Sequence, residues 1–298
     1  MVATICPPFV VGYETGHLLP AMIAVMSALF VGFSDHEAPA RRTFPILLLT
    51  ALVVSPCIAL GRVVPPYLED MLVLSFALPL AAGLMALWGE AFAAAGFFGC
   101  VSYVIAMSVP APPESIPFTL LWSLAGGIYA VLISLLPWPR HCVPLVVSKG
   151  PGAVLHAIRL SLAVGLATIA AYGLNLERAY WVPMTAAFVM RPLIFHTRKA
   201  MMERCIGTAV GSIVASLILG HFAADLPRIA ALAAATFFTF TIFPVSYSGF
   251  SARIACVVLI ELSIGLPPYP HVALVRIEDT VLGAGVAFLV HTLVVDRR

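Results

Sequence analysis

The sequence contains few charged residues. Only 10% of its 298 residues are Asp, Glu, Lys or Arg, whereas a soluble domain carries about 25%. Hydrophobic residues make up 61% of the chain. So few charges cannot cover a water-exposed surface, while a surface that faces the bilayer needs none. The composition therefore excludes a soluble domain and predicts an integral membrane protein.

The sequence also lacks the motifs that would indicate an enzyme or a metal site. The six cysteines are widely separated and form no CxxC pair, so they are expected to be small apolar residues within helices. There is no glycine-rich phosphate loop, no HExxH and no GxSxG. The net charge of +2 gives no basis for binding nucleic acid. We therefore expect no enzymatic activity, no cofactor and no metal.

Apolar runs fill most of the chain, and charged residues or Pro/Gly clusters separate them. A helix needs about 20 residues to span a bilayer, and the runs at 180–192 and 252–266 are shorter than that. We therefore expect an all-α, polytopic membrane protein with some short or broken helices. The runs are 1–12, 18–33, 43–62, 71–88, 92–109, 118–137, 154–174, 180–192, 203–220, 229–246, 252–266 and 277–295.

The two halves of the chain repeat each other. Pro20 matches Pro183 and Arg42 matches Arg204, each pair about 160 residues apart. With about six helices in each half, the repeats are expected to be parallel. The predicted organisation is a first membrane repeat at 1–137, a cytoplasmic linker at 138–153 and a second membrane repeat at 154–298. The counterpart of residue 154 would precede residue 1, so we expect the first helix to be truncated.

The distribution of basic residues predicts the orientation. If each run crosses once and the N-terminus is inside, most of the 16 basic residues lie on or near the cytoplasmic side. We therefore expect both termini to be cytoplasmic. The basic residues expected outside are Arg62, Arg178, Arg228 and Arg276.

The segment 180–192 is the most informative for function. Pro183 suits the first turn of a helix, and Pro192 stops that helix about three turns later. Such a short helix can aim its positive N-terminal end at an anion inside the membrane. Tyr180 and Trp181 would then form an aromatic wall, with the Thr185 hydroxyl beside it. The alternative is an interfacial helix anchored by its aromatic residues.

Several charged residues are candidates for recognition, coupling or gating. Arg191 and Arg204 could contact a carboxylate on the cytoplasmic side, although Arg204 could instead cap a neighbouring helix. Glu261 lies in an apolar run, where a carboxylate must be paired or protonated; Arg253, two turns away, could pair with it. Arg276 and Asp279 are three residues apart and share a helix face. They could form a structural ion pair or a gate, and Asp279, like Glu261, could bind a proton.

Three segments resemble the fusaric acid resistance-like family, also called aromatic acid exporters. They are Tyr180–Pro192, Arg204–Gly211 and Arg276–Gly283, in that order. The second half resembles one full membrane module of that family, and the first half resembles it more weakly. Many members carry a large cytosolic domain, whereas this chain has only the short linker between its halves.

The resemblance implies proton-coupled export of aromatic or other small carboxylic acids across a bacterial inner membrane. It also implies a periplasmic membrane-fusion protein as partner, and we consider a homo-oligomer as well. A passive anion channel is an alternative, because plant malate channels are distantly similar. A non-transporting scaffold is another. The segment Gly32–Arg42 faintly resembles a loop signature of major facilitator transporters, a fourth interpretation.

Overall fold

The structure, a computed structural model, describes residues 2–34, 40–65, 67–136, 151–190, 194–222, 224–241, 246–264 and 271–294, and these are helical apart from short connections. No strand occurs among them, which confirms the all-α prediction. The remaining residues, which include Arg191 and most of the predicted linker, lie outside this description. The α-helices are α1 (Val2–Glu14), α2 (Leu18–Phe33), α3 (Ala40–Val63), α4 (Leu68–Leu84), α5 (Glu90–Ala106), α6 (Ile116–Ser134), α7 (Pro151–Gly173), α8 (Trp181–Val189), α9 (Ile194–His221), α10 (Asp225–Thr241), α11 (Tyr247–Leu262) and α12 (Val272–Leu293).

Each apolar run corresponds to one helix, but α9 begins well before its run. The run starts near residue 203, whereas α9 starts at Ile194. The residues in between contain the polar stretch 196–199, which interrupts the apolar pattern, but they also include Arg, Lys, Ala and Met, which favour helix. The run predicted that Arg204 lies at the start of its helix, and this prediction is wrong. Arg204 lies ten residues into α9, about 15 Å along the axis.

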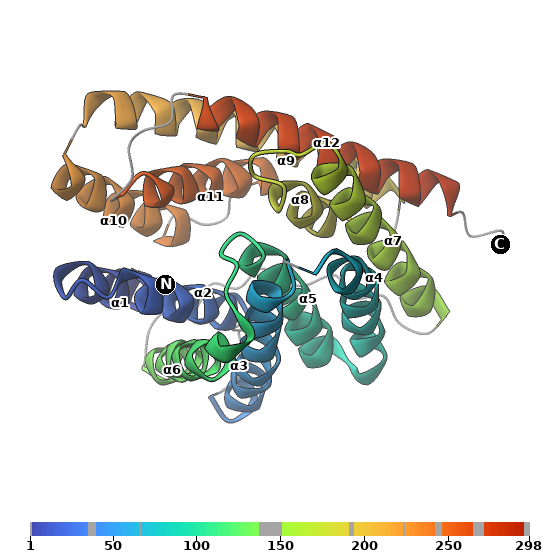
Figure 1. The fold of residues 1–298 in the computed structure, drawn as a ribbon, viewed down its shortest axis with the longest axis horizontal. Coiled ribbons are helices and arrows are strands. Elements are labelled where there is room, and N and C mark those ends of the chain that lie inside the picture. Colours follow the sequence, from blue (N-terminus) through green and yellow to red (C-terminus); the bar gives the residue numbers. More distant parts are fainter. Residues whose placement is uncertain are drawn as a thin grey trace.

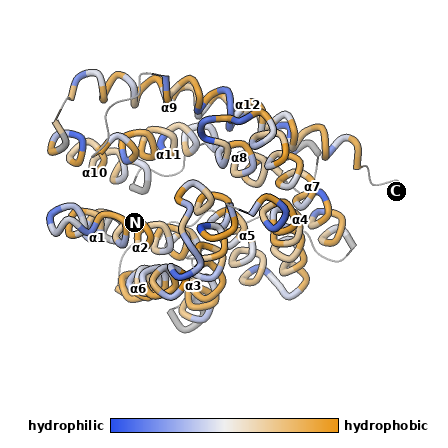
Figure 2. Tube along the Cα trace, in the orientation of Figure 1, coloured by the Kyte–Doolittle hydropathy of each residue, from blue (hydrophilic) through white to orange (hydrophobic). Residues whose placement is uncertain are grey.

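The helices have the lengths and surfaces of a multi-pass membrane protein. Five segments are long and apolar enough to cross a bilayer: Thr43–Val63, Leu68–Trp88, Pro113–Ser134, Gly152–Gly173 and His196–His221. Many large apolar side chains on the helices face outward; Leu217 is 71% exposed and Leu226 75%. Figure 2 shows that apolar residues dominate nearly every helix. A surface of this kind is stable against lipid and unstable against water.

The two halves of the chain form two groups of helices that lie one above the other in Figure 1. Helices α1–α6 make the lower group in that view and α7–α12 the upper one. The main contact between the groups is α4 against α7, and α8 also touches α5. Within the groups, α2 packs on α6 and α3 on α5, while α8 packs on α12 and α9 on α11.

Glycine residues mark the closest approaches between helices. A Cβ atom at Gly283 of α12 would overlap the Val182 carbonyl oxygen of α8. A Cβ at Gly211 would overlap the Ala252 carbonyl oxygen in the same way. Gly207 and Gly211 thus bring α9 against α11, and glycines at this GxxxG spacing let two helix backbones approach closely. In the first half, Gly126 of α6 lies equally close to α2.

The contact at Gly283 gives a stability prediction. Gly283→Ala should lower the free energy of unfolding by about 1–3 kcal/mol, because α12 must move away from α8 to accept the methyl group. The thermal midpoint of the detergent-solubilised protein measures this effect. Gly285→Ala is the matched control, since a Cβ at Gly285 would meet nothing within 4 Å. Equal midpoints for the two variants would contradict the close packing.

Candidate functional site

Helix α8 is short and buried near the middle of the molecule. Its nine residues run from Trp181 to Val189, about 13 Å at 1.5 Å per residue, which is too short to span a bilayer. Pro183 lies in its first turn, as the sequence predicted, and Met190 ends the helix in an extended conformation. The helix packs on α12, α7 and α9 of its own half and touches α5 of the other half. Every α8 residue except Phe188 is buried.

Two arginines lie over aromatic rings on one face of α8. The face is formed by Trp181, Thr185 and Phe188, whose spacing places them on one side of a helix. The guanidinium carbon of Arg276 is 4.6 Å from the centroid of the Trp181 ring. That of Arg204 is 4.9 Å from the centroid of the Phe188 ring. Because Trp181 and Phe188 are two turns apart, the two cations lie near opposite ends of α8, with Thr185 between them.

Three other buried arginines serve as caps on helix ends. Each donates a hydrogen bond to a carbonyl group at or just beyond a helix C-terminus, where backbone acceptors lack partners. The pairs are Arg62 Nε with Val109 O (3.1 Å), Arg159 Nε with Val294 O (2.9 Å) and Arg228 Nη1 with Ser263 O (2.9 Å). Burial of these guanidinium groups is thus compensated by hydrogen bonds, and their role is structural.

Arg204 and Arg276 have no such compensation. They are only 2% and 1% exposed, and neither forms a hydrogen bond or an ion pair with any residue that the structure describes. They are also close enough for the charge of Arg204 to act on Arg276. A buried, unpaired guanidinium group is costly, and a second one nearby raises the cost. An anion bound between them would offset both charges.

Hydroxyl groups extend this polar region along α9 and α8. Arg204, Thr208 and Ser212 recur every four residues and therefore share one face of α9. The hydroxyls of Thr208 and Ser212 are buried without a hydrogen-bond partner in the described part of the chain, and so is that of Thr185. Ser216, the next residue in the series, instead bonds to the Ser212 carbonyl in the ordinary way. Unpaired hydroxyls on the same helix face as the Arg204 guanidinium group can donate to the oxygens of an anion.

The predicted carboxylates lie close to this region. Asp279 is 2% exposed, and its Oδ2 atom has no partner among the described residues. It is within electrostatic range of Arg276, but Arg276 lies over Trp181 and the two form no direct ion pair. Glu261, on α11, is partly exposed and within electrostatic range of Tyr180.

Of the two remaining candidate arginines, Arg191 and Arg253, only Arg253 lies in the described part of the chain. Arg253 donates to the Phe238 carbonyl of α10 at 3.2 Å. Arg191 lies outside the described residues, so its predicted contact with a carboxylate stays a prediction. Tyr180 is buried, and its ring centroid is 5.7 Å from that of Trp181.

Sequence reasoning missed three members of the region, namely Thr208, Ser212 and Phe188. The four-residue spacing of Arg204, Thr208 and Ser212 was a readable signal for a polar face on α9. Phe188 gave no comparable signal, because its contact with Arg204 depends on how α8 crosses α9. Arg276 was predicted as a gate or ion-pair residue. It lies over Trp181 and forms no ion pair with a described residue, and its role as a gate stays a prediction.

A match to a known family lies in the second half of the chain. Residues 166–290 match the family described as fusaric acid resistance protein-like, and this range contains α8 and both arginines. "Uncharacterized protein ORF2" of Neisseria gonorrhoeae is 34% identical over 139 residues, which are 46% of this chain and 33% of that protein. No solved structure matches.

Two relatives in Escherichia coli K12 align over shorter segments. "Uncharacterized transporter YdhK" is 36% identical over 66 residues, which are 22% of this chain and 10% of that protein. "Uncharacterized protein YhfK" is 36% identical over 74 residues, which are 25% of this chain and 10% of that protein. The aligned part therefore covers a third or less of each relative.

The contrast between the two groups of arginines predicts opposite stability effects. Arg228→Gln should lower the free energy of unfolding by about 1.5–3 kcal/mol, because it loses hydrogen bonds to backbone carbonyls. Arg276→Met should leave it unchanged or raise it, since removing an unpaired buried charge outweighs a cation–π contact of about 2 kcal/mol. The thermal midpoints of the two detergent-solubilised variants and of the unmodified protein measure these effects. An equal loss in both variants would show that Arg276 is structural.

Proposed function

We propose that the protein is a multi-pass membrane transporter that exports small organic anions, because residues 166–290 match the family described as fusaric acid resistance protein-like. The name of the YdhK relative, which contains the word transporter, supports transport as the general activity. Aromatic and related carboxylic acids are the substrates that the family resemblance favours. The proposed location is the bacterial inner membrane, with both termini cytoplasmic.

One observation carries the substrate class: Arg204 and Arg276 are buried beside α8 without partners in the described part of the chain. A carboxylate that enters the bilayer loses its water and needs charged or hydrogen-bonding groups in exchange. Guanidinium groups provide paired donors for carboxylate oxygens. The substrate carboxylate would lie between the two arginines, near Thr185.

The aromatic residues of α8 suit the apolar part of such a substrate. Trp181 and Tyr180 lie next to each other at the start of the helix, and Phe188 lies near its end. An aromatic acid could place its ring against these side chains while its carboxylate contacts the arginines. The site thus combines an apolar wall with a few charged donors, which is typical of small-molecule sites.

The packing of the two halves supports a two-repeat transporter. The pairs α2–α6, α3–α5 and α3–α6 in the first half correspond in order to α8–α12, α9–α11 and α9–α12 in the second. Gly126 approaches Ala24 as Gly283 approaches Val182. We infer that the halves are parallel repeats, and movement of one against the other would expose the site alternately to each side.

Proton coupling would use Asp279 or Glu261. Asp279 is buried within electrostatic range of Arg276, so loss of its negative charge on protonation would strengthen the hold of Arg276 on a substrate anion. Glu261, on α11, is within electrostatic range of Tyr180. A periplasmic membrane-fusion protein would carry the substrate onward, as the resemblance implies. No step of this proposal requires an enzymatic reaction.

The recognition prediction concerns Arg204 and Arg276. In proteoliposomes, Arg204→Gln and Arg276→Gln should each raise the half-saturating concentration for benzoate counterflow at least tenfold, because one charge-assisted contact is worth about 1.5–3 kcal/mol. Arg198→Gln is the matched control, since Arg198 is exposed on α9. If both variants kept the affinity of the unmodified protein, the carboxylate would bind elsewhere. If the unmodified protein showed no counterflow at all, the scaffold interpretation would gain support.

The coupling prediction separates the transporter from a passive channel. Asp279→Asn or Glu261→Gln should abolish acceleration of benzoate export by a pH gradient, while counterflow at equal pH continues. The neutral side chain cannot carry the proton, yet it keeps the shape of the site. Glu114→Gln serves as control, since Glu114 lies before α6, far from α8 in sequence. If a pH gradient did not change the benzoate flux through the unmodified protein, the passive channel would be favoured.

A further inference from the structure

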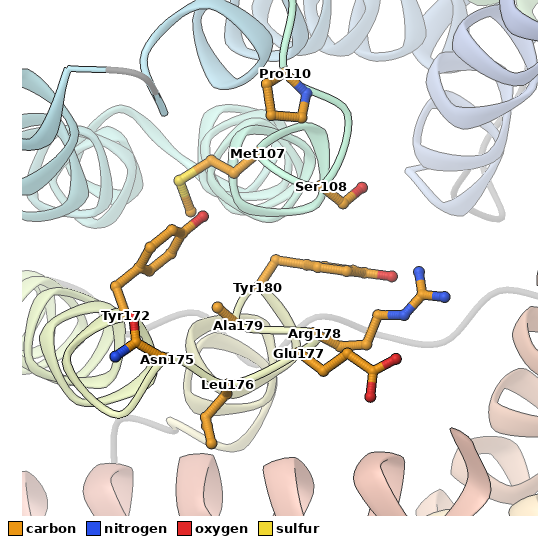
Figure 3. Close-up of a pocket in the computed structure, with 10 residues that line it drawn as sticks. All are labelled: Met107, Ser108, Pro110, Tyr172, Asn175, Leu176, Glu177, Arg178, Ala179 and Tyr180. Carbon is orange, nitrogen blue, oxygen red and sulfur yellow. The ribbon is translucent and has the colours of Figure 1, made fainter. Parts of the chain in front are cut away.

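A pocket of about 340 Å³ lies beside the start of α8, between the two halves of the chain. The connection after α5 forms one wall, and the connection from α7 to α8 forms the other (Figure 3). The volume is within the range of small-molecule sites. The residues that line it include Met107, Ser108, Tyr172, Asn175, Arg178 and Tyr180.

The end of α7 shapes this pocket. Asn175 adopts a left-handed conformation, with φ 50°, which few residues other than glycine tolerate and Asn tolerates best. The Leu176 N–H donates to the Ala171 carbonyl at 3.1 Å, which closes the helix end in the manner of a C-terminal cap. The chain then turns back toward α8 and brings Arg178 and Tyr180 to the pocket (Figure 3).

Arg178 is the cation of the pocket, and its guanidinium group is available to a ligand. It forms no hydrogen bond or ion pair with any residue that the structure describes. The neighbouring Glu177 is engaged elsewhere, with its Oε2 atom 3.0 Å from His271 Nε2. Tyr172, Tyr180 and Met107 supply apolar surface around it, and Asn175 and Ser108 add hydrogen-bonding groups.

Trp181 connects this pocket with the buried pair of arginines. The guanidinium carbon of Arg178 is 5.9 Å from the centroid of the Trp181 ring, and that of Arg276 is 4.6 Å from it. Arg178 is partly exposed, whereas Arg276 is buried. An anion could therefore move from one guanidinium group to the next past a single side chain.

We propose that the pocket is a second binding site for a small carboxylate with a flat apolar body, distinct from the site between Arg204 and Arg276. Arg178 binds the carboxylate, and Tyr172 and Tyr180 contact the body. The binding is a property of the pocket itself; its role as the release site on the outer side rests on the proposed function. Binding here is weaker than at the buried pair, because water screens a partly exposed charge.

Equilibrium dialysis of the detergent-solubilised full chain with radiolabelled benzoate tests the proposal. The unmodified protein should bind benzoate at a tighter and a weaker site. Arg178→Gln should raise the dissociation constant of the weaker site at least fivefold and leave the tighter one unchanged. Arg198→Gln, an exposed arginine on α9, is the control and should change neither. Ser108→Trp, at an exposed rim position, should block the weaker site by filling the pocket.

The outcomes separate the pocket from the proposed function. Arg276→Gln should weaken the tighter site alone. If Arg178→Gln and Ser108→Trp leave both sites unchanged, the pocket proposal is overturned while the buried site stands. If Arg178→Gln weakens binding but Arg276→Gln does not, the pocket stands and the proposed substrate site fails. A single site that depends only on Arg276 also overturns the pocket.

Discussion

The cost of burying a guanidinium group governs where the arginines of this protein lie. Arg62, Arg159 and Arg228 offset this cost by donating to carbonyl groups at or just beyond helix C-termini. These acceptors have no partner within their own helices, and the negative end of the helix dipole adds to the attraction. The same three bonds tie helix ends to segments far away in the chain, so the hydrogen bonds that satisfy the arginines also hold the helix ends in place.

Arg204 and Arg276 depart from this pattern because of the length and position of α8. A nine-residue helix ends within the protein, so its aromatic residues lie where neighbouring helices carry charged side chains. Gly283 allows α12 to approach the backbone of α8, and this approach places Arg276 over Trp181. The close packing at one glycine and the position of the unpaired charge are therefore parts of one arrangement.

Three guanidinium groups follow the course of α8, from the partly exposed Arg178 through Arg276 to Arg204. An anion beside this helix would always have one of them within reach, with Thr185 between the two buried ones. One wall of the pocket at Arg178 belongs to the first half of the chain, whereas Arg204, Arg276 and the α8 residues that they contact all belong to the second half. Movement between the halves would consequently alter the pocket more than the buried pair.

The sequence by itself determined the membrane environment, the number and order of the helices and the shortness of α8. Each of these follows from local composition: hydropathy reports contact with lipid, and Pro183 and Pro192 limit a helix wherever they occur. It also singled out Trp181, Thr185, Arg204, Arg276 and Asp279. Only the tertiary structure decided which arginines are paired. Whether a guanidinium group contacts a carbonyl, an aromatic ring or neither depends on how helices distant in sequence cross. In the sequence, Arg159 and Arg204 are both arginines in apolar helices. They differ only because α7 packs on α12, where Arg159 finds a carbonyl, and α9 packs on α8, where Arg204 finds a ring.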